Sequence, residues 1–549
     1  MQNHQLNKKQ ILISLLIISL VSFGFKLYTF DPTVTPSEDT YGYVLRAIAH
    51  NNGDFSEHPR KTLGWSLVIS PFLNLIESDD FLDYINIARY LSIAISIITI
   101  YPMYLLGRRF FDEKFALCAA GFFAFMPQLN FHASSGYTEP LFILILILST
   151  YFILKKNSNL VYLSFASLAT LWYVHWSGII FFIALSLILF LNNKKSKKLF
   201  LKYLLCIGIF ILISSPMLTQ RYEQYGDPLF FSQSSAVFTG NPAAILADNT
   251  KNLNYSYQDY IRDNGIAEFI YKFLLLGISN ILGAIFLNSL PFLIVFLPFG
   301  ILFSFRAFDQ DTNFIRSNWI MIIIPIISMI YYFGVWPEKR LLLQLIPFLI
   351  IFSIIPLQRV IMYGLSTFEF NNNQKNLFLL GVLIAIVLLS FIFTLQYGPP
   401  DTRLEYEKIE FANMLVKTFE GNILDAGYTL DGLHYVKLSD HKNISKDFTV
   451  NLDRNSILGT QKLLEVKIYA ENLDEFMLES EKYDTKYISI NKNGIEATTF
   501  WYPYLLDLYD SEEKYPFLTK VFDSSEKGFE KFHVKVFKIN FSKYHEFYS

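Results

Sequence analysis

The sequence predicts a polytopic α-helical membrane protein that carries a small α/β domain in its C-terminal part. The 549 residues are 52% hydrophobic and 17% aromatic, and their mean hydropathy of +0.32 is higher than soluble domains of this length usually have. About eleven runs within residues 1–396 are long and apolar enough to cross the hydrocarbon core as helices. From residue 397 the composition becomes polar and charged.

The first apolar run predicts a membrane anchor that is not removed. Residues 11–30 follow Lys8 and Lys9, and no small-residue cleavage pattern ends the run, so we do not expect a signal peptide. The N-terminus is then expected in the cytoplasm. The predicted spans are 11–30, 84–107, 114–131, 138–155, 159–174, 177–192, 199–217, 279–304, 317–335, 341–358 and 376–396.

The Lys and Arg residues predict the side of the membrane that each turn faces. Short cytoplasmic loops collect these residues, and here they gather in alternate turns between the predicted spans. They are Arg108, Arg109 and Lys114; Lys155 and Lys156; Lys194, Lys195, Lys197, Lys198 and Lys202; and Arg306 and Arg316. An odd number of spans across a plasma membrane then places the C-terminus outside, together with two long loops, residues 31–83 and 218–278.

The C-terminal residues 397–549 are expected to form an extracytoplasmic α/β domain after the transmembrane domain of residues 1–396. A Gly-Pro-Pro sequence at 398–400 predicts a linker between the two. Apolar periodicity predicts a helix over residues 405–419. Short alternating runs predict strands at 421–425, 487–490 and 534–539.

Composition excludes several classes of function. The net charge is −2 and the isoelectric point is near 6.5, so a basic surface for nucleic acid is not expected. Cys118 and Cys206 are far apart inside apolar runs and provide neither a disulfide framework nor a paired-cysteine metal site. The HExxH, Walker, GxSxG and GxGxxG motifs do not occur in their required context.

Two acidic residues open a predicted helix in the first outer loop. Thr35 and Glu38 match a capping box, in which Glu38 would accept a hydrogen bond from the Thr35 backbone amide. Asp39 has no such structural task, so it is the better candidate for chemistry, and a favourable interaction with the helix dipole is the alternative. Helical spacing places Asp39 on one face with Tyr43, Arg46 and His50.

A second acidic candidate, Glu139, begins the fourth predicted span at its outer end. A carboxylate that faced lipid there would be costly, so Glu139 is expected to face the protein interior or a wet cavity. The alternative is a helix N-terminus whose acid is hydrated by water.

Lys339 and Arg340 are cationic candidates at the outer end of a late apolar helix, against the charge bias of the other turns. Arg340 could hold a lipid phosphate with its forked donors, and snorkelling at the membrane boundary is the alternative for both residues. His175, in another outer turn, could donate a hydrogen bond to a phosphate or a hydroxyl. Membership of an interfacial aromatic belt is the alternative for His175.

A succession of short motifs follows the chain in a characteristic order. They are Asp39–Tyr43 and His58-Pro59, then Leu106–Phe111, Met126-Pro127 and Thr138–Leu141, then Arg221-Tyr222 and Gly226–Leu229, and finally Lys339–Leu343 with Pro347. This order resembles the GT-C glycosyltransferases, especially the branch that contains protein mannosyltransferases and aminoarabinose transferases. The resemblance covers roughly residues 10–360.

This resemblance implies a GT-C-like membrane enzyme whose donor is a sugar linked to polyprenyl phosphate. Asp39, with Glu38 beside it, matches the family's first-loop acid, which acts as base or metal ligand, and Glu139 matches its second acid. Arg340 matches the cation that holds the lipid phosphate. Further substrate-binding positions are Lys339, His175, His58 and Arg221. The family often has Asp-Glu where this chain has Glu38-Asp39, and Arg where it has His175, so the division of labour between the acids stays open.

The chemistry expected from this resemblance is inverting glycosyl transfer at the outer membrane face. Asp39 would take the proton of the acceptor hydroxyl, and Arg340 would neutralise the departing phosphate. Glu139 would either orient the acceptor or bind a divalent metal together with Asp39, and such oxygen ligands suit Mg²⁺ or Mn²⁺. The expected partners are the lipid-linked donor, a lipid, glycan or protein acceptor, and membrane lipids, but no nucleic acid.

Two other classes of protein are alternatives to the enzyme. A transporter or lipid flippase should show polar groups near the membrane midplane and repeated halves, and the sequence shows neither. A sensor or scaffold would use its outer domain to bind a ligand, and about eleven spans exceed what an anchor needs.

Overall fold

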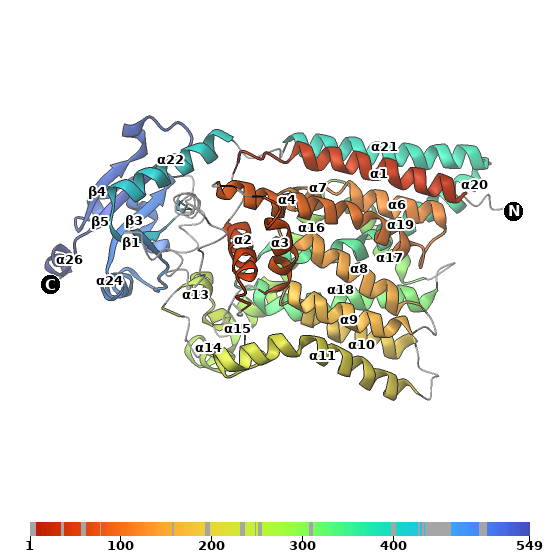
Figure 1. Ribbon diagram of the computed structural model, residues 1–549, viewed down its shortest axis with the longest axis horizontal. Coiled ribbons are helices and arrows are strands. Elements are labelled where there is room, and N and C mark those ends of the chain that lie inside the picture. The colour runs from red at the N-terminus through yellow and green to blue at the C-terminus, as the bar shows by residue number, and fades with distance from the viewer. Residues whose placement is uncertain are drawn as a thin grey trace.

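The computed structural model shows a helical bundle and a smaller α/β domain (Figure 1). The long helices of the bundle run roughly side by side, and the α/β domain lies at one end of them, whereas the N-terminus lies at the opposite end. The structure describes residues 7–34, 38–55, 62–76, 78, 80–155, 159–192, 198–230, 236–247, 249–250, 255–306, 311–396, 402–426, 429–430, 433, 463–492 and 502–548.

The bundle is built from apolar helices that are joined mostly by short turns. In the first half these are α1 (Lys8–Tyr28), α2 (Glu38–Asn51), α3 (Gly64–Leu73), α4 (Phe81–Ile98), α5 (Ile100–Gly107), α6 (Glu113–Ala124), α7 (Pro127–Ser134), α8 (Glu139–Ile153), α9 (Leu160–Val174), α10 (Gly178–Asn192) and α11 (Leu199–Tyr225). The second half contains η1 (Val237–Thr239), α13 (Pro242–Leu246), α14 (Tyr257–Asn264), α15 (Ile266–Phe269), η2 (Ile270–Leu276), α16 (Gly277–Asn288), α17 (Leu293–Ser304), α18 (Thr312–Phe333), η3 (Lys339–Leu345), α19 (Ile346–Arg359), η4 (Val360–Gly364), α20 (Leu365–Thr367) and α21 (Asn372–Gln396).

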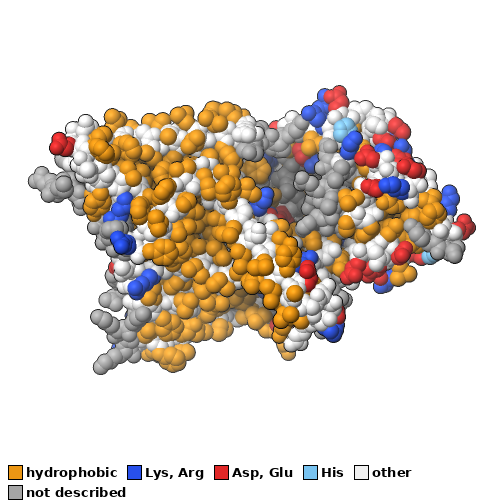
Figure 2. All heavy atoms as spheres, turned by 180° about the vertical axis from the view of Figure 1, so that it is seen from behind, with side chains coloured by type: hydrophobic (Ala, Val, Ile, Leu, Met, Phe, Trp, Pro, Cys, Tyr) orange, Lys and Arg blue, Asp and Glu red, His pale blue; other side chains and the backbone are white. Residues whose placement is uncertain are grey.

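The bundle has the character of a multi-pass membrane protein. In the part of the chain that the structure describes, seven helices are long and apolar enough to cross a membrane, and five shorter apolar helices accompany them. Hydrophobic side chains cover the visible face of the bundle, whereas charged side chains gather on the α/β domain (Figure 2). The predicted fold class is therefore confirmed, and the number of about eleven crossings stays a prediction.

Two predicted spans, residues 114–131 and 279–304, are not single helices. The first is divided between α6, which ends at Ala124, and α7, which begins at Pro127. In the second, α16 ends before Pro291 and α17 begins after it, because proline has no N–H to continue a helix and its ring clashes with the preceding turn. The side chains of Asn280 and Asn288 each donate a hydrogen bond of 2.8 Å, the first to the last carbonyl oxygen of α18 and the second to the first of η3. α16 therefore lies across the ends of its neighbours.

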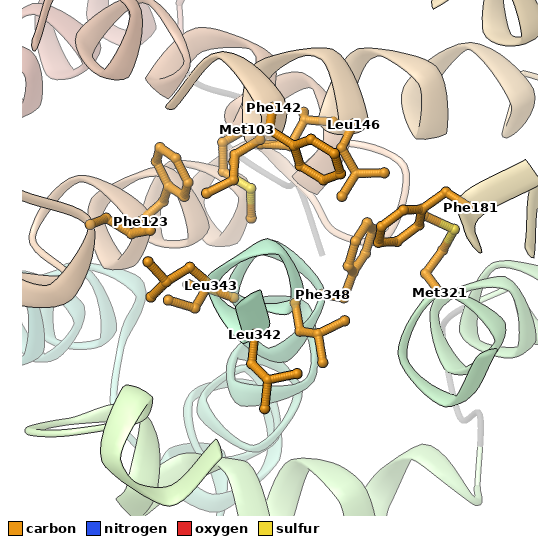
Figure 3. Packing of buried hydrophobic residues seen from close by; sticks show 14 of the residues in the cluster. Met103, Phe123, Phe142, Leu146, Phe181, Met321, Leu342, Leu343 and Phe348 are labelled. Carbon is orange, nitrogen blue, oxygen red and sulfur yellow. The ribbon is translucent and has the colours of Figure 1, made fainter. Parts of the chain in front are cut away.

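The core of the bundle fixes the short helix η3. Its Leu342 and Leu343 are fully buried and belong to the same core as side chains from several other helices (Figure 3). These side chains are Met103 of α5, Phe123 of α6, Phe142 and Leu146 of α8, Phe181 of α10, Met321 of α18 and Phe348 of α19. Close packing in such a core leaves little room for displacement, so the residues at the start of η3 are held in place.

The α/β domain is a five-stranded sheet with helices on both faces. The order of its strands is β2-β1-β3-β5-β4, with β1 parallel to β2 and β3, and β5 antiparallel to β3 and β4. Ile423 and Leu424 of β1 point to opposite faces, where they join separate cores that contain Phe411 of α22 and Phe476 of α24. The elements are α22 (Thr402–Thr418), β1 (Gly421–Asp425), β2 (Leu463–Val466), α24 (Leu473–Lys482), β3 (Thr485–Asn491), η6 (Pro503–Leu508), η7 (Glu512–Lys514), β4 (Leu518–Asp523), η8 (Ser524–Lys527), β5 (Val534–Ile539) and α26 (Phe541–Tyr548).

Side-chain contacts join the α/β domain to the loops of the bundle. The Asn249 side chain donates a hydrogen bond to the Tyr469 carbonyl oxygen at 2.9 Å and accepts one from the Tyr469 amide at 3.0 Å. The Tyr406 hydroxyl lies 3.2 Å from the Thr33 hydroxyl. The domain is thus attached to both long loops that the sequence predicts on the outer side of the membrane.

Candidate active site

Asp39 lies in the first turn of α2, which begins at Glu38. The Thr40 hydroxyl ties this turn to the connection between α7 and α8, because it donates a hydrogen bond of 2.9 Å to the Ser135 carbonyl oxygen. The predicted capping box lies outside the described residues, since neither Thr35 nor the side chain of Glu38 is described.

Glu139 is the first residue of α8, and the turn before it is firmly held. Gly136 has a φ of +80°, which favours glycine, and a Cβ there would lie 2.9 Å from the Arg89 side chain. The Gly136 carbonyl oxygen accepts a hydrogen bond of 3.0 Å from the Trp65 indole. Arg89 Nε donates to the Ser134 carbonyl oxygen at 2.8 Å. These contacts fix the direction in which Glu139 leaves the turn.

Arg340 is the second residue of η3 and is supported from two directions. The buried leucines that follow it anchor η3 in the core of the bundle. The Asn288 side chain of α16 holds the carbonyl oxygen of Lys339, the residue directly before Arg340. The Lys339 side chain itself is exposed.

The Arg340 guanidinium brings Asp39 and Glu139 together, although these residues are 301 and 201 positions away from it in the sequence. Its Nη1 lies 2.7 Å from Asp39 Oδ2, and its Nε lies 3.3 Å from Glu139 Oε1. Its Nε is also 3.6 Å from Glu338 Oε1. The Tyr137 ring lies under the guanidinium with 4.8 Å between the ring centroid and Cζ, a cation–π contact. We define Asp39, Glu139, Glu338 and Arg340 as the carboxylate cluster.

The members of the carboxylate cluster differ in their access to solvent. The Asp39 side chain is 35% exposed and that of Glu338 is 31% exposed, whereas Arg340 is 23% and Glu139 only 17% exposed. Glu139 Oε2 is buried and has no hydrogen-bond partner among the described residues. Asp39 is thus the most accessible carboxylate of the cluster, and Glu139 is the carboxylate that lies beneath the arginine.

Three carboxylates surround one guanidinium, so the cluster is electronegative. Tyr43 of α2 is buried beside it, and burial together with the charges of Asp39 and Glu139 raises the pKa of Tyr43 well above its usual value. The Tyr43 phenol therefore keeps its proton at neutral pH.

His175 lies in the turn between α9 and α10, where it terminates α9 with extended backbone angles. Its Nδ1 accepts a hydrogen bond of 3.2 Å from the Ser177 amide and lies 2.8 Å from the Ser177 hydroxyl. Burial, with a further contribution from the positive charge of Arg340, lowers the pKa of His175 to about 4, and Asp39 opposes this shift. His175 is thus neutral at physiological pH and close enough to the carboxylate cluster to be affected by its charges.

Of the remaining predicted positions, Arg221 and Lys339 make no described contact with the cluster. His58 lies outside the described residues. Arg221 is buried on α11, where its guanidinium carbon lies 5.9 Å from the ring centroid of Trp172, one turn before His175. Lys339 makes no hydrogen bond or ion pair through its side chain within the described ranges.

The residues that were predicted to share a helical face with Asp39 do not all lie beside the cluster. Tyr43 lies beside it, but His50 is buried farther along α2. The His50 Nδ1 pairs with the Asp54 carbonyl oxygen at 2.9 Å, and the ring stacks on Phe55 at 5.1 Å. His50 therefore terminates the helix and has no role in the cluster.

Two residues of the site were not predicted from the sequence. Glu338 stands two positions before Arg340, and Tyr137 stands two positions before Glu139. Proximity along the chain to an already suspected residue is the one signal that pointed to them, and no periodicity distinguishes them from neighbouring charged and aromatic side chains.

The carboxylate cluster in this arrangement does not fit a divalent metal. Its oxygens have the right chemistry for Mg²⁺ or Mn²⁺, but the guanidinium occupies the space between Asp39 and Glu139. The described residues contain no group of three or more His, Cys, Asp or Glu side chains placed to hold a metal ion.

Comparisons with known proteins agree with the predicted resemblance. Residues 68–219, less than half of the chain, match the model of the dolichyl-phosphate-mannose-protein mannosyltransferase family. No curated protein matches the sequence.

Solved structures of an oligosaccharyltransferase share the fold of most of this chain. The apo oligosaccharyltransferase of Archaeoglobus fulgidus is 13% identical, with a TM-score of 0.56 over 94% of this chain and 73% of that one. The same oligosaccharyltransferase, AglB, with an inhibitory peptide and a dolichol-phosphate is 15% identical, with a TM-score of 0.55 over 93% and 72%. ArnT from Cupriavidus metallidurans bound to undecaprenyl phosphate is 12% identical, with a TM-score of 0.49 over 97% and 98%. The chain has the GT-C fold, and the resemblance to polyprenyl-phosphate-dependent GT-C glycosyltransferases is confirmed.

Proposed function

We propose that this protein is an inverting glycosyltransferase that moves a sugar from a polyprenyl-phosphate donor to an acceptor hydroxyl. The observation that carries the proposal is the carboxylate cluster, in which Arg340 contacts both Asp39 and Glu139 at the end of the bundle that faces the α/β domain. The partial match to the mannosyltransferase family and the GT-C fold support the class of reaction.

Asp39 acts as the general base. It is the most exposed carboxylate of the cluster, so an acceptor hydroxyl can approach it. The acceptor oxygen attacks C1 of the sugar, its proton passes to the Asp39 carboxylate, and the bond between C1 and the phosphate oxygen breaks. A positioned base contributes about 10²–10⁴-fold to such a rate.

Arg340 stabilises the polyprenyl phosphate that departs with the bonding electrons. Its Nη1 and Nε point at carboxylates, so the remaining N–H groups are those that reach the phosphate. Positive charge held at the leaving group stabilises the transition state more than the ground state. Glu139 lies beneath Arg340 and aims the guanidinium.

A divalent metal is not part of the proposed mechanism. Mg²⁺ or Mn²⁺ would have to displace Arg340 in order to use both Asp39 and Glu139 as ligands. We therefore assign no step of the reaction to a metal, and Glu139 takes the orienting role.

The proposed topology places the reaction at the outer face of the plasma membrane, with the N-terminus in the cytoplasm. The positive-inside rule supports this orientation. The α/β domain, from residue 397 onward, then lies outside the membrane next to the cluster, where an extracytoplasmic lipid, glycan or protein acceptor would arrive. The transporter or flippase alternative is favoured neither by the fold nor by the cluster at the end of the bundle.

Transfer of a labelled sugar by the purified full-length protein, reconstituted in lipid, tests the proposal. We expect product from polyprenyl-phosphate-linked sugars and a loss of about 10²–10⁴-fold in Asp39→Asn, which removes the base but keeps the shape. Asp510→Asn is the matched control, because Asp510 is an exposed acid of the α/β domain outside the motifs of the resemblance. Absence of transfer from a panel of such donors, or full activity of Asp39→Asn, would contradict the proposal.

A further inference from the structure

A small cavity borders Glu139 of the carboxylate cluster, between α4, α6, α7 and α8. Its lining includes Ser96 of α4, Thr99 directly after that helix, and His132 of α7. The volume open to a water-sized molecule is about 10 Å³, and one water molecule needs about 10–15 Å³ measured in this way. The cavity therefore has room for a single water molecule.

Two residues that line this cavity each contribute a buried polar atom without a hydrogen-bond partner. The atoms are Nδ1 of His132 and Oε2 of Glu139, and no described group pairs with either of them. Such atoms lower the stability of a fold when they stay unpaired, and they are the groups that buried water molecules bridge. The Thr99 hydroxyl donates a hydrogen bond of 2.6 Å to the Ile95 carbonyl oxygen, so its oxygen can accept one from the same water.

Water fits the hydrogen-bonding chemistry of both atoms. Burial, with a further contribution from the charge of Arg340, lowers the pKa of His132 to about 3, so the ring is neutral and carries one proton. A water molecule donates one hydrogen bond to the Glu139 oxygen, and it can either donate to His132 Nδ1 or accept from it. Both neutral tautomers of the histidine are therefore compatible with a bridging water.

His132 also supports the aromatic ring that lies under Arg340. The ring centroids of His132 and Tyr137 are 5.5 Å apart, and the Tyr137 centroid is 4.8 Å from Cζ of Arg340. On the other side of the cavity, Glu139 places its Oε1 3.3 Å from Arg340 Nε. One face and one edge of the guanidinium thus rest on residues that His132 adjoins.

We infer that a water molecule bound in this cavity bridges His132 Nδ1 and Glu139 Oε2, and that His132 is a positioning residue that holds Glu139 beneath Arg340. The inference rests on the proposed function, because the direction of the guanidinium matters for transfer only if Arg340 stabilises the departing phosphate. His132 acts through the water and Glu139 and contacts none of the reacting atoms.

Two variants remove the water bridge from opposite sides of the cavity. His132→Leu removes Nδ1 and keeps an apolar side chain of similar size, whereas Ser96→Val fills the cavity and leaves the His132 ring in place. We expect each to lower kcat of sugar transfer about 10-fold, as is typical when a hydrogen bond to a charged group is lost. KM for the donor should change by less than about threefold, because Arg340 keeps its charge and loses only its aim at the transition state.

Two further variants serve as controls. In His132→Asn the amide group takes the place of Nδ1 and can bind the same water, so kcat should stay within about threefold of the wild type. Ser186→Val matches Ser96→Val, because Ser186 is a buried serine of α10 whose hydroxyl has no described partner and which does not line this cavity. Its kcat should equal that of the wild type.

An experimental structure of the full chain, at a resolution that shows ordered water, tests the site itself. We expect a water molecule within hydrogen-bond distance of both atoms in the wild type and none in Ser96→Val. Three results would overturn the inference: no water between the two atoms in the wild type, wild-type kcat in His132→Leu, or an equal loss of kcat in His132→Asn and His132→Leu. The last would show that packing of the imidazole ring, and not the water, supports the site. If Ser96→Val does not fold, the wild-type structure and the two His132 variants decide.

The water site and sugar transfer are measured separately, so failure of the inference differs from failure of the proposed function. A bridging water in a wild type that transfers no sugar from any polyprenyl-phosphate donor would support the water site and refute the transferase mechanism. Transfer that depends on Asp39, in a protein without water between His132 and Glu139, would support the mechanism and refute the inference.

Discussion

Two buried carboxylates of this protein, Glu407 in the α/β domain and Glu139 in the bundle, have opposite surroundings. Glu407 accepts hydrogen bonds from the backbone amides of Glu530, Lys531 and Phe532 at 3.0, 2.8 and 2.7 Å, and Arg403 lies 3.3 Å away. Glu139 has Arg340 at one oxygen and no described partner at the other.

The comparison separates a structural carboxylate from one that is kept for function. Burial alone would raise the pKa of Glu407, but the three backbone amides and Arg403 together bring it below its usual value. A buried oxygen without a hydrogen-bond partner lowers the stability of a fold. Such an oxygen is therefore expected where a water molecule or a substrate must bind. The carboxylate cluster has this property, and the Glu407 site does not.

Substitution of the arginine that contacts each carboxylate should give the largest difference in sugar transfer between the two sites. Arg340→Lys keeps the charge but loses the fork that contacts Asp39 and Glu139 together. We expect sugar transfer to fall about 10²–10³-fold, the range seen when one transition-state donor is removed.

Arg403→Lys is the matched control, because Arg403 is largely exposed on α22. Transfer should be unchanged, and the free energy of unfolding should move by no more than about 1 kcal/mol. Equal transfer rates in the two variants would remove the distinction between the two sites.

The two glutamates themselves provide the next comparison. Glu139→Gln should lower transfer by about 10–100-fold, because a neutral amide directs the guanidinium less strongly. Glu407→Gln should leave transfer per folded molecule unchanged but lower the stability of the α/β domain by about 1–3 kcal/mol, since its three amide donors lose a charged acceptor. Activity assays and thermal unfolding of the full chain measure both effects. Loss of transfer in Glu407→Gln together with normal transfer in Glu139→Gln would refute the assignment of Glu139 to the active site.

A smaller effect concerns the response of stability to pH. Burial and the charge of Arg340 lower the pKa of His175 to about 4 and that of His132 to about 3. Between pH 6.5 and 4 the unfolded chain binds protons that these folded histidines refuse, so stability falls as the pH falls. Each histidine contributes up to about 1.4 kcal/mol per pH unit. Glu407 has a lowered pKa, so its contribution to stability is present above the usual glutamate pKa and is lost as the pH falls from there toward its folded pKa, and it changes little between pH 7 and 5.

Thermal unfolding between pH 7 and 5 checks this prediction. His175→Gln should show a shallower loss of stability than the wild type, whereas Glu407→Gln should follow the wild-type slope from a lower starting value. A slope that does not change in His175→Gln would show that the histidine is not held neutral.

Local patterns predicted much of the fold. Apolar runs located the helices of the bundle, and short-range periodicity located α22, β1, β3 and β5 of the α/β domain. β2 and β4 were not predicted, because β2 has only four residues and β4 places charged and apolar side chains without clear alternation. The predicted spans 114–131 and 279–304 were wrong as single helices, since a run of apolar residues carries no information about where a proline divides it.

The candidate site was predicted only as separate residues. Asp39 was suspected because the neighbouring Glu38 has a capping role and Asp39 has none, Glu139 because a carboxylate that faces lipid is costly, and Arg340 because a cation at the outer face goes against the charge bias. The pairing of Arg340 with both acids depends on contacts across hundreds of residues. No local pattern encodes such contacts. The contact between Ser177 and Gln344 of η3 depends in the same way on residues that are 167 positions apart in the sequence.

The stereochemistry of transfer tests the central claim most directly. NMR of the product formed from a donor of known anomeric configuration distinguishes direct attack by an acceptor that Asp39 has deprotonated from a route through a glycosylated carboxylate. Direct attack gives inversion at C1, which is the result expected from one accessible base beside a single arginine. Retention of the donor configuration in wild-type product would contradict the account, because a second displacement would then be required.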